Sequence, residues 1–200
     1  MEDFLKFKKE ILLRAKENDA CVEQYKEAYN SADFEELFIV IKRNFIWCCE
    51  NNVINASLFD DFNEILKEHK IYGNLSSNEG YIYAWDNATV EAWGNATVYA
   101  LDNATVKAWG NATVKALDNA TVEAWGNATV EAWDNATVKA LDNATVEAWG
   151  NATVEAWGNS YIYSFIRIEC KLSDNAIYRV INENIIFYSS DNIKFSKINL

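Results

Sequence analysis

The sequence predicts an α+β protein in which a small N-terminal helical domain precedes a two-sided β-solenoid. Residues 1–72 space their apolar side chains at helical intervals, whereas residues 81–163 repeat one eight-residue unit. A strict short repeat indicates that successive units stack and bury a continuous core. We therefore divide the chain into a helical domain (1–72), a linker (73–80), a regular octapeptide solenoid (81–163) and degenerate terminal coils with a cap (164–200).

The helical domain is expected to contain four helices. Apolar residues at three- and four-residue spacing predict helices at 4–15, 20–29, 34–48 and 58–66. Ser31 is the expected N-cap of the helix at 34–48, and Ser57 suits the start of the last helix. The Asn, Ser and Gly content of the linker is typical of a turn-rich connector.

The repeated unit reads Asp/Gly-Asn-Ala-Thr-Val-x-Ala-Trp/Leu, and ten copies run from Tyr83 to Tyr163. Nine copies keep Asn-Ala-Thr-Val, and the tenth relaxes to Asn-Ser-Tyr-Ile at 159–162. Strand alternation directs Ala, Val and Ala inward and directs Thr and the variable residue outward. Small inward residues predict a thin core between two closely spaced sheets. We expect Asn to close each turn through a left-handed backbone and to form ladders along the axis.

The variable position decides how many octads make one coil. At sixteen-residue spacing it alternates in sign, as Glu91, Lys107, Glu123, Lys139 and Glu155. Since stacked strands lie ~4.8 Å apart, each charge then has opposite charges as neighbours. A twenty-four-residue coil would instead stack like charges, which is destabilising. We therefore expect two octads per sixteen-residue coil and about five regular coils.

The last position of the octad is Trp in seven copies and Leu in three. Strict alternation places it outside, although so many exposed large apolar side chains are unusual in a soluble monomer. Either the bend turns these side chains inward over the alanines, or they form a surface for a partner or a second copy. The candidate interaction surface consists of Trp93, Trp109, Trp125 and Trp157, together with the column of alternating charges.

A column of turn carboxylates is a candidate metal site. Asp86, Asp102, Asp118 and Asp134 recur at sixteen-residue spacing. Adjacent carboxylates would repel by about 0.9 kcal/mol even at the dielectric constant of water. Bound Ca²⁺ could relieve that repulsion, since it takes carboxylate and carbonyl oxygens. The alternative, which we favour, is that these carboxylates accept hydrogen bonds from local amides, and we expect no cofactor.

Composition narrows the class of protein. A net charge of −12 disfavours binding to nucleic acid. No stretch reaches transmembrane length, and the start of the chain lacks the apolar region of a signal peptide. The adjacent Cys48 and Cys49 do not suggest a disulfide framework, which favours the cytoplasm. His69 is the single histidine and is expected to add positive charge at a helix C-terminus, so we expect no enzyme activity.

Taken whole, the chain resembles uncharacterised proteins of anaerobic gut bacteria and their phages. Those proteins join a small helical domain to Asn-Ala-Thr-Val octads and to an end similar to Ile-Glu-Cys-Lys-Leu-Ser-Asp-Asn-Ala. In this chain the resemblance covers the octads and residues 168–176. It implies a mobile-element setting and assigns no site residues.

Three functions remain open at this level. The first is a non-enzymatic protein-binding or scaffold module, which associates with a protein partner or with itself through the solenoid. The second is a phage or mobile-element inhibitor that presents an acidic, nucleic-acid-like surface to a basic protein. The third is a carbohydrate or small-ligand binder that uses a ladder of Trp rings.

Overall fold

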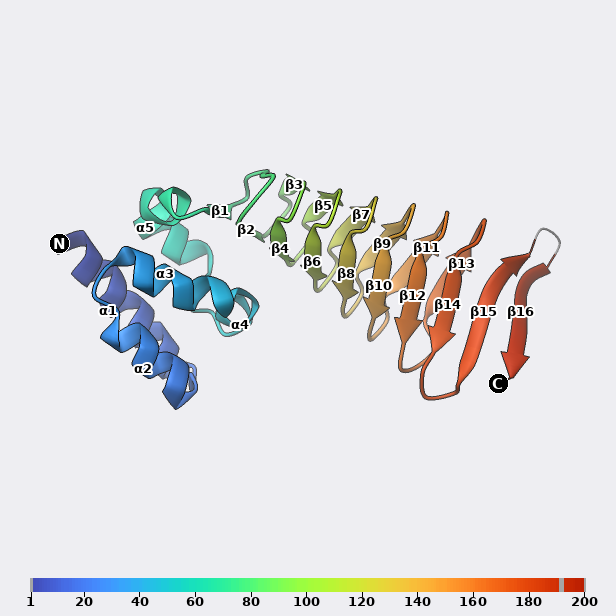
Figure 1. Ribbon diagram of the computed structural model, residues 1–200, viewed down its shortest axis with the longest axis horizontal. Helices are drawn as coiled ribbons and strands as arrows, with labels where there is room; N and C mark the ends of the chain where they lie inside the picture. Colours follow the sequence, from blue (N-terminus) through green and yellow to red (C-terminus); the bar gives the residue numbers. More distant parts are fainter. Residues whose placement is uncertain (1, 191–192, 200) are drawn as a thin grey trace. The chain divides into compact units, whose positions relative to one another are not determined.

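The computed structural model describes residues 2–190 and 193–199. Internal contacts divide the chain into two compact units, with the division between Gly73 and Asn74. The first unit is helical and the second is a β-solenoid of about six turns (Figure 1).

The helical unit contains five helices within its described residues, not the four that we expected. They are α1 (Glu2–Glu17), α2 (Val22–Asn30), α3 (Phe34–Arg43), α4 (Phe45–Glu50) and α5 (Ala56–Glu68), followed by the short strand β1 (Ile71–Gly73). The expected helix at 34–48 is interrupted at Asn44, where φ is −113° and ψ is 25°. The side-chain amide of Asn44 donates to the carbonyl oxygen of Val40 at 2.8 Å, so it satisfies a backbone group at the break.

The predicted cap of α3 was wrong by two residues. Asp33 is the N-cap, and its carboxylate accepts a hydrogen bond from the Glu36 amide at 3.0 Å. Glu36 in turn accepts from the Ala32 amide at 2.7 Å, so the two acidic side chains satisfy two free donors at the helix start. Ser31 instead donates its hydroxyl to the carbonyl oxygen of Glu27, at the end of α2.

The predicted start of α5 was also wrong by two residues. Asn55 has the extended backbone of an N-cap and accepts from the Leu58 amide at 3.2 Å. Ser57 lies inside the helix and donates its hydroxyl to the same side chain of Asn55. An amide oxygen can therefore cap the helix while it also accepts from a neighbouring hydroxyl.

Aromatic rings form the centre of the helical unit. Phe7 is fully buried, stacks on Phe38 and meets Phe62 edge to face, with ring centroids 5.2 Å apart in both pairs. His69 ends α5 as its C-cap, and its ring stacks on Phe38 at 4.1 Å. The imidazole Nδ1 lies 3.7 Å from a carboxylate oxygen of Glu35. The single histidine thus packs at the edge of the aromatic core.

The strands between residues 81 and 180 alternate between two sheets with parallel neighbours, which we call sheet A and sheet B (Figure 1). In sheet A lie β2 (Tyr81–Ala84), β4 (Thr97–Ala100), β6 (Thr113–Ala116), β8 (Thr129–Ala132), β10 (Thr145–Ala148), β12 (Tyr161–Ser164) and β14 (Ile177–Val180). In sheet B lie β3 (Thr89–Ala92), β5 (Thr105–Ala108), β7 (Thr121–Ala124), β9 (Thr137–Ala140), β11 (Thr153–Ala156) and β13 (Glu169–Leu172).

The register confirms the sixteen-residue coil. Thr105 pairs with Thr89 on one side and with Thr121 on the other. Lys107 accordingly lies between Glu91 and Glu123, as the alternation of charge predicted. Every repeat therefore meets its own copy one coil away, and the whole solenoid shares one register.

The inward and outward sides of each strand also agree with the alternation. In β7, Val122 and Ala124 are completely buried, and so is Ala120 in the turn before the strand. Thr121 and Glu123 of the same strand are partly exposed. Because the inward side chains are small, the two sheets enclose a narrow core made almost entirely of Ala and Val.

The turns correct one expectation about backbone conformation. The left-handed residue is the Asp or Gly before Asn, and not Asn itself: Asp102, for example, has φ of 60°. The Ala104 amide donates to the Leu101 carbonyl at 3.2 Å and closes a four-residue turn around Asp102 and Asn103. Left-handed backbone strongly favours Gly and is tolerated by Asp, which explains why only these two residues occupy the position in the octads.

The Asn side chains form the predicted ladders along both edges. On one edge the amide of Asn127 donates to the side-chain oxygen of Asn111 at 3.4 Å, and Asn143 donates to Asn127 at the same distance. On the other edge Asn151 donates to Asn135 at 3.3 Å. These Asn side chains thus join consecutive coils outside the sheets.

The two ends of the solenoid differ from its regular coils. The linker contributes to the first coil, because the Ser77 amide donates to the Glu91 carbonyl and the Trp93 amide donates to Ser77. At the other end, β12, β13 and β14 continue the coil. The chain then leaves the coil for two antiparallel strands, β15 (Ile185–Ser190) and β16 (Ile193–Asn199), with β15 paired to β14. The pairing of β15 with β14 covers the backbone groups of β14, which would otherwise form a free edge.

Within the described part of the chain, none of the helices is both long and apolar enough to span a membrane.

Candidate interaction surface

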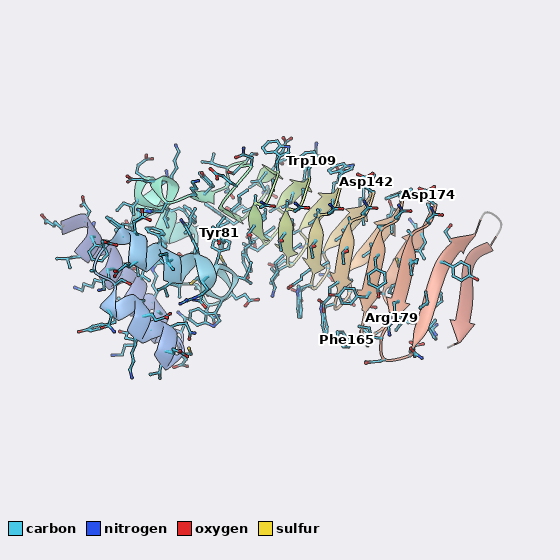
Figure 2. The ribbon with its side chains drawn as sticks, in the orientation of Figure 1. Tyr81, Trp109, Asp142, Phe165, Asp174 and Arg179 are labelled. Atoms are coloured by element: carbon cyan, nitrogen blue, oxygen red, sulfur yellow. The ribbon has the colours of Figure 1, made fainter. Side chains whose placement is uncertain are left out.

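Two ridges of aromatic side chains follow opposite edges of the solenoid. Ridge 1 consists of Trp93, Trp109 and Trp125, which directly follow strands of sheet B. Ridge 2 consists of Trp133, Trp149 and Phe165, which directly follow strands of sheet A. Figure 2 shows Trp109 at one edge of the coils and Phe165 at the other.

The rings of each ridge stack nearly parallel. In ridge 1 the centroid of Trp109 lies 5.7 Å from Trp93 and 4.9 Å from Trp125. In ridge 2 Trp149 lies 5.0 Å from Trp133 and 4.7 Å from Phe165. These distances follow the strand spacing, because identical positions of adjacent coils lie one strand apart. Stacking of this kind adds about 0.5–1.5 kcal/mol per pair beyond area burial.

The rings are half-buried. This burial is intermediate between the two arrangements that the sequence left open, which were packing inward over the alanines and a surface for a partner. Trp93, the first ring of ridge 1, has 38% of its surface exposed, and Trp109 and Trp125 have less. Each ring covers the faces of its neighbours, while its outer edge remains in solvent. The bend therefore removes part of the apolar surface from water without placing the rings in the core.

The predicted residue Trp157 is separated from ridge 1. In the sixteen-residue register Leu141 occupies the position between Trp125 and Trp157. The smaller side chain interrupts the stack, so the structure brings three of the four predicted Trp residues together. Ridge 2 was absent from the candidate surface, although the same spacing places its Trp residues one coil apart.

The outward column of sheet B has the charge pattern that the sequence predicted. Glu123 lies 3.6 Å from Lys139, and Glu155 lies 2.9 Å from Lys171 (nitrogen to oxygen). The hydrogen bond from Lys171 lowers the pKa of Glu155, and the same bond raises the pKa of Lys171. These pairs are solvent-exposed and individually weak, but the column repeats them from coil to coil.

The outward column of sheet A lacks that alternation. Glu131 and Glu147 occupy adjacent coils in register, so two like charges are neighbours. Lys115 lies 3.6 Å from Glu131 on the other side. The Tyr163 hydroxyl donates to Glu147 at 2.7 Å, and this bond is the main reason why the pKa of Tyr163 is raised to about 12.

The ridges differ in their polar surroundings. In ridge 2 the indole nitrogen of Trp149 donates to Glu147 at 3.0 Å, and the Lys115 ammonium lies 5.0 Å from the Trp133 ring centroid. For Trp93, Trp109 and Trp125, the described residues provide no hydrogen-bond acceptor to the indole N–H groups. The indole N–H of Trp133 in ridge 2 also lacks a partner among the described residues, but it is buried. The unused donors of ridge 1 lie beside half-exposed apolar rings and are open to a partner.

The Asp column makes hydrogen bonds to the backbone. A carboxylate oxygen of Asp102 accepts from the Asp86 amide at 3.1 Å, and Asp118 accepts from the Asp102 amide at 3.2 Å. The other edge repeats this arrangement, with Asp142 accepting from Gly126. Over the described residues no group of three or more His, Cys, Asp or Glu side chains is arranged to hold a metal ion. Asp134, the fourth predicted member, has the same left-handed turn conformation.

No protein-family model matches this chain, and comparison with curated proteins and with solved structures gave no match. A bacterial or phage origin stays a prediction from the resemblance of the repeats.

Proposed function

We propose that this chain is a non-enzymatic scaffold that binds a protein partner, its own copies included, through ridge 1 of the solenoid. The observation that carries the proposal is a row of half-exposed Trp rings on a hydrogen-bonded coil. Trp is enriched at protein interfaces because it combines a large apolar surface with one polar donor. In ridge 1 both features are available to a partner.

The solenoid supports binding because it holds the rings in place before a partner arrives. Backbone pairing, the Asn ladders and ring stacking each fix the position of one coil against the next. A surface that is ordered in advance loses less conformational entropy on association. We propose that ridge 2 contributes less, because Glu147 and Lys115 already interact with its rings.

The geometry gives less support to the other two functions. A sugar ring would need the open face of an aromatic ring, whereas the faces inside each stack are covered by neighbouring rings. An acidic surface that imitates nucleic acid would need unpaired carboxylates. In sheet B the Glu residues alternate with Lys, and in the turns Asp102 and Asp118 already accept amide hydrogen bonds.

The decisive experiment replaces ridge 1 by Leu, the residue that the repeat itself uses at this position in three copies. Light scattering of the full chain at micromolar concentration should show dimers or larger assemblies. The triple variant Trp93→Leu, Trp109→Leu, Trp125→Leu should be monomeric. The matched control Trp133→Leu, Trp149→Leu, Phe165→Leu changes ridge 2 and should retain the assembly.

Tryptophan emission provides a second readout of the same proposal. If ridge 1 is an interface between copies, dilution should shift the emission to longer wavelength, and the ridge 1 variant should lose that shift. If the wild-type chain is monomeric, the partner must be another protein. Capture of proteins from a lysate is then compared between the two triple variants. A monomer whose captured proteins do not depend on ridge 1 would contradict the proposal.

The inhibitor alternative predicts a different outcome. A monomer that displaces nucleic acid from a basic protein, and loses this effect in high salt, would favour the acidic surface.

A further inference from the structure

The helical unit contains a partly open cavity of about 130 Å³. It lies beneath α2, and its walls come from α1, α2, α3, α4 and the segments that join them. The helix α2 buries a single residue, Ala28, and further small side chains at Ala15 and Ala20 line the space. The small side chains on this side of α2 leave the space unfilled.

The lining of the cavity is uncharged. Ile11, Val40 and Ile41 contribute apolar surface, and Trp47 contributes an aromatic ring. Cys48 also lines the cavity, and burial raises the pKa of its thiol to about 12, so the thiol is neutral at physiological pH. A charged molecule would lose its hydration without gaining an opposite charge, which selects for a neutral ligand.

One polar group of the lining lacks a protein partner. Gln24 lines the cavity, and its side-chain oxygen is buried with no donor from the described residues within hydrogen-bonding distance. By contrast, the amide nitrogen of Asn44, another lining residue, donates to the carbonyl oxygen of Val40. A buried polar group without a partner is destabilising, and a ligand that pairs with it removes that cost.

We propose that this cavity binds a small neutral aromatic alcohol, with its ring among the apolar side chains and its hydroxyl donating to Gln24. The size agrees with this class, since an apolar cavity of about 150 Å³ in another protein holds benzene. A hydroxyl group both donates and accepts, so it can pair with either end of the Gln24 amide. The proposal is independent of the solenoid ridges.

The experiment titrates the full chain with phenol and with toluene, which have the same size and differ in the hydroxyl group. Binding is followed by NMR shifts of the Val40 and Ile41 methyl groups, which line the cavity. Phenol should bind roughly tenfold more tightly than toluene, as expected for pairing one buried polar group. In Gln24→Leu this preference should disappear, and toluene should bind at least as tightly as phenol.

A filling variant tests the location. Ala28→Leu extends a side chain into the cavity and should abolish saturable shifts with both compounds, while circular dichroism verifies that the helices are retained. Retained binding in this variant would overturn the proposed site. Equal affinities for phenol and toluene in the wild-type chain would overturn the role of Gln24, and absence of saturable shifts with phenol would overturn the proposal as a whole.

Discussion

The two sheets of the solenoid belong to the same coils, share one register and enclose one core. The charges in their outward columns are nevertheless arranged differently. In sheet B each charge of the column lies between charges of opposite sign, as Lys107 does between Glu91 and Glu123. Sheet A instead places Glu131 next to Glu147. Lys115 and Tyr163, at either side of this pair, provide the compensating contacts.

This difference shows that the inward residues of the repeat determine the fold, whereas its outward residues can vary. In the regular coils the buried Val and Ala residues are the same in both sheets, so they fix the coil whichever residue faces solvent. The outward position is then constrained only by its neighbours one coil away. Sheet B satisfies that constraint by alternation and sheet A by local partners. We expect the two sheets to respond alike to changes in the core and differently to changes in charge.

The largest effect should come from enlarging the shared core. Ala124→Leu in sheet B and Ala132→Leu in sheet A each add volume where the wild-type side chain is fully buried. Both should lower the free energy of unfolding by about 2–3 kcal/mol, as overpacking does in tight cores. Urea denaturation measures the loss. The control Thr121→Val, on the outward side of β7, should change it by less than about 0.5 kcal/mol. If only one of the two Leu variants loses stability, the two sheets do not contribute equally to the core.

Charge reversal should distinguish the sheets. Glu123→Lys in sheet B faces Lys107 and Lys139 and should cost about 0.5–1 kcal/mol. Added salt should reduce this loss. The matched change Glu131→Lys in sheet A loses attraction to Lys115 but gains attraction to Glu147, so its net effect should be smaller. Urea denaturation at low and high salt measures the free energy of unfolding of both variants. Equal losses would contradict the idea that the effect of a charge depends on the charges one coil away.

The last prediction concerns the titration of Tyr163 in sheet A. Its pKa of about 12 exceeds the ordinary value because its hydroxyl donates a hydrogen bond to Glu147 and, to a lesser degree, because of burial. The raised pKa favours the protonated phenol in the folded chain. This contribution to stability is therefore complete below the unfolded pKa of ~10 and is lost as pH rises towards the folded value.

The phenolate absorbance measures this titration, with Tyr163→Phe as the difference reference. Glu147→Gln should move the pKa of Tyr163 towards its ordinary value, because the neutral amide no longer stabilises the phenol as strongly. An unchanged titration in that variant would exclude Glu147 as the cause.

The helical unit shows where sequence patterns were insufficient. Hydrophobic spacing located its helical segments, but it did not reveal the break at Asn44 or the caps at Asp33 and Asn55. Ser, Asp and Asn all favour the N-cap, and the choice among neighbouring candidates depends on which backbone is extended and directs its side chain to the first-turn amides. That conformation is set by packing around the helix start.

The stacking of the Trp rings was predicted in part for a related reason. The sixteen-residue register alone determines that Trp93, Trp109 and Trp125 are neighbours and that Leu141 separates Trp157 from them. The register does not determine how deeply each ring is buried. The half-buried stacks depend on the bend after each strand, which the pattern of apolar and polar residues does not specify.

The sequence by itself determined the length of the coil, its register and which side chains face the core, because an exact repeat must meet its own copy at every coil. Only the tertiary structure decided which turn residue is left-handed, how deeply the Trp rings are buried and why the last strands reverse direction. The tertiary structure also determined that a cavity lies beneath α2. These features depend on contacts between residues that follow no period, so their free energies are set by the three-dimensional packing of each site.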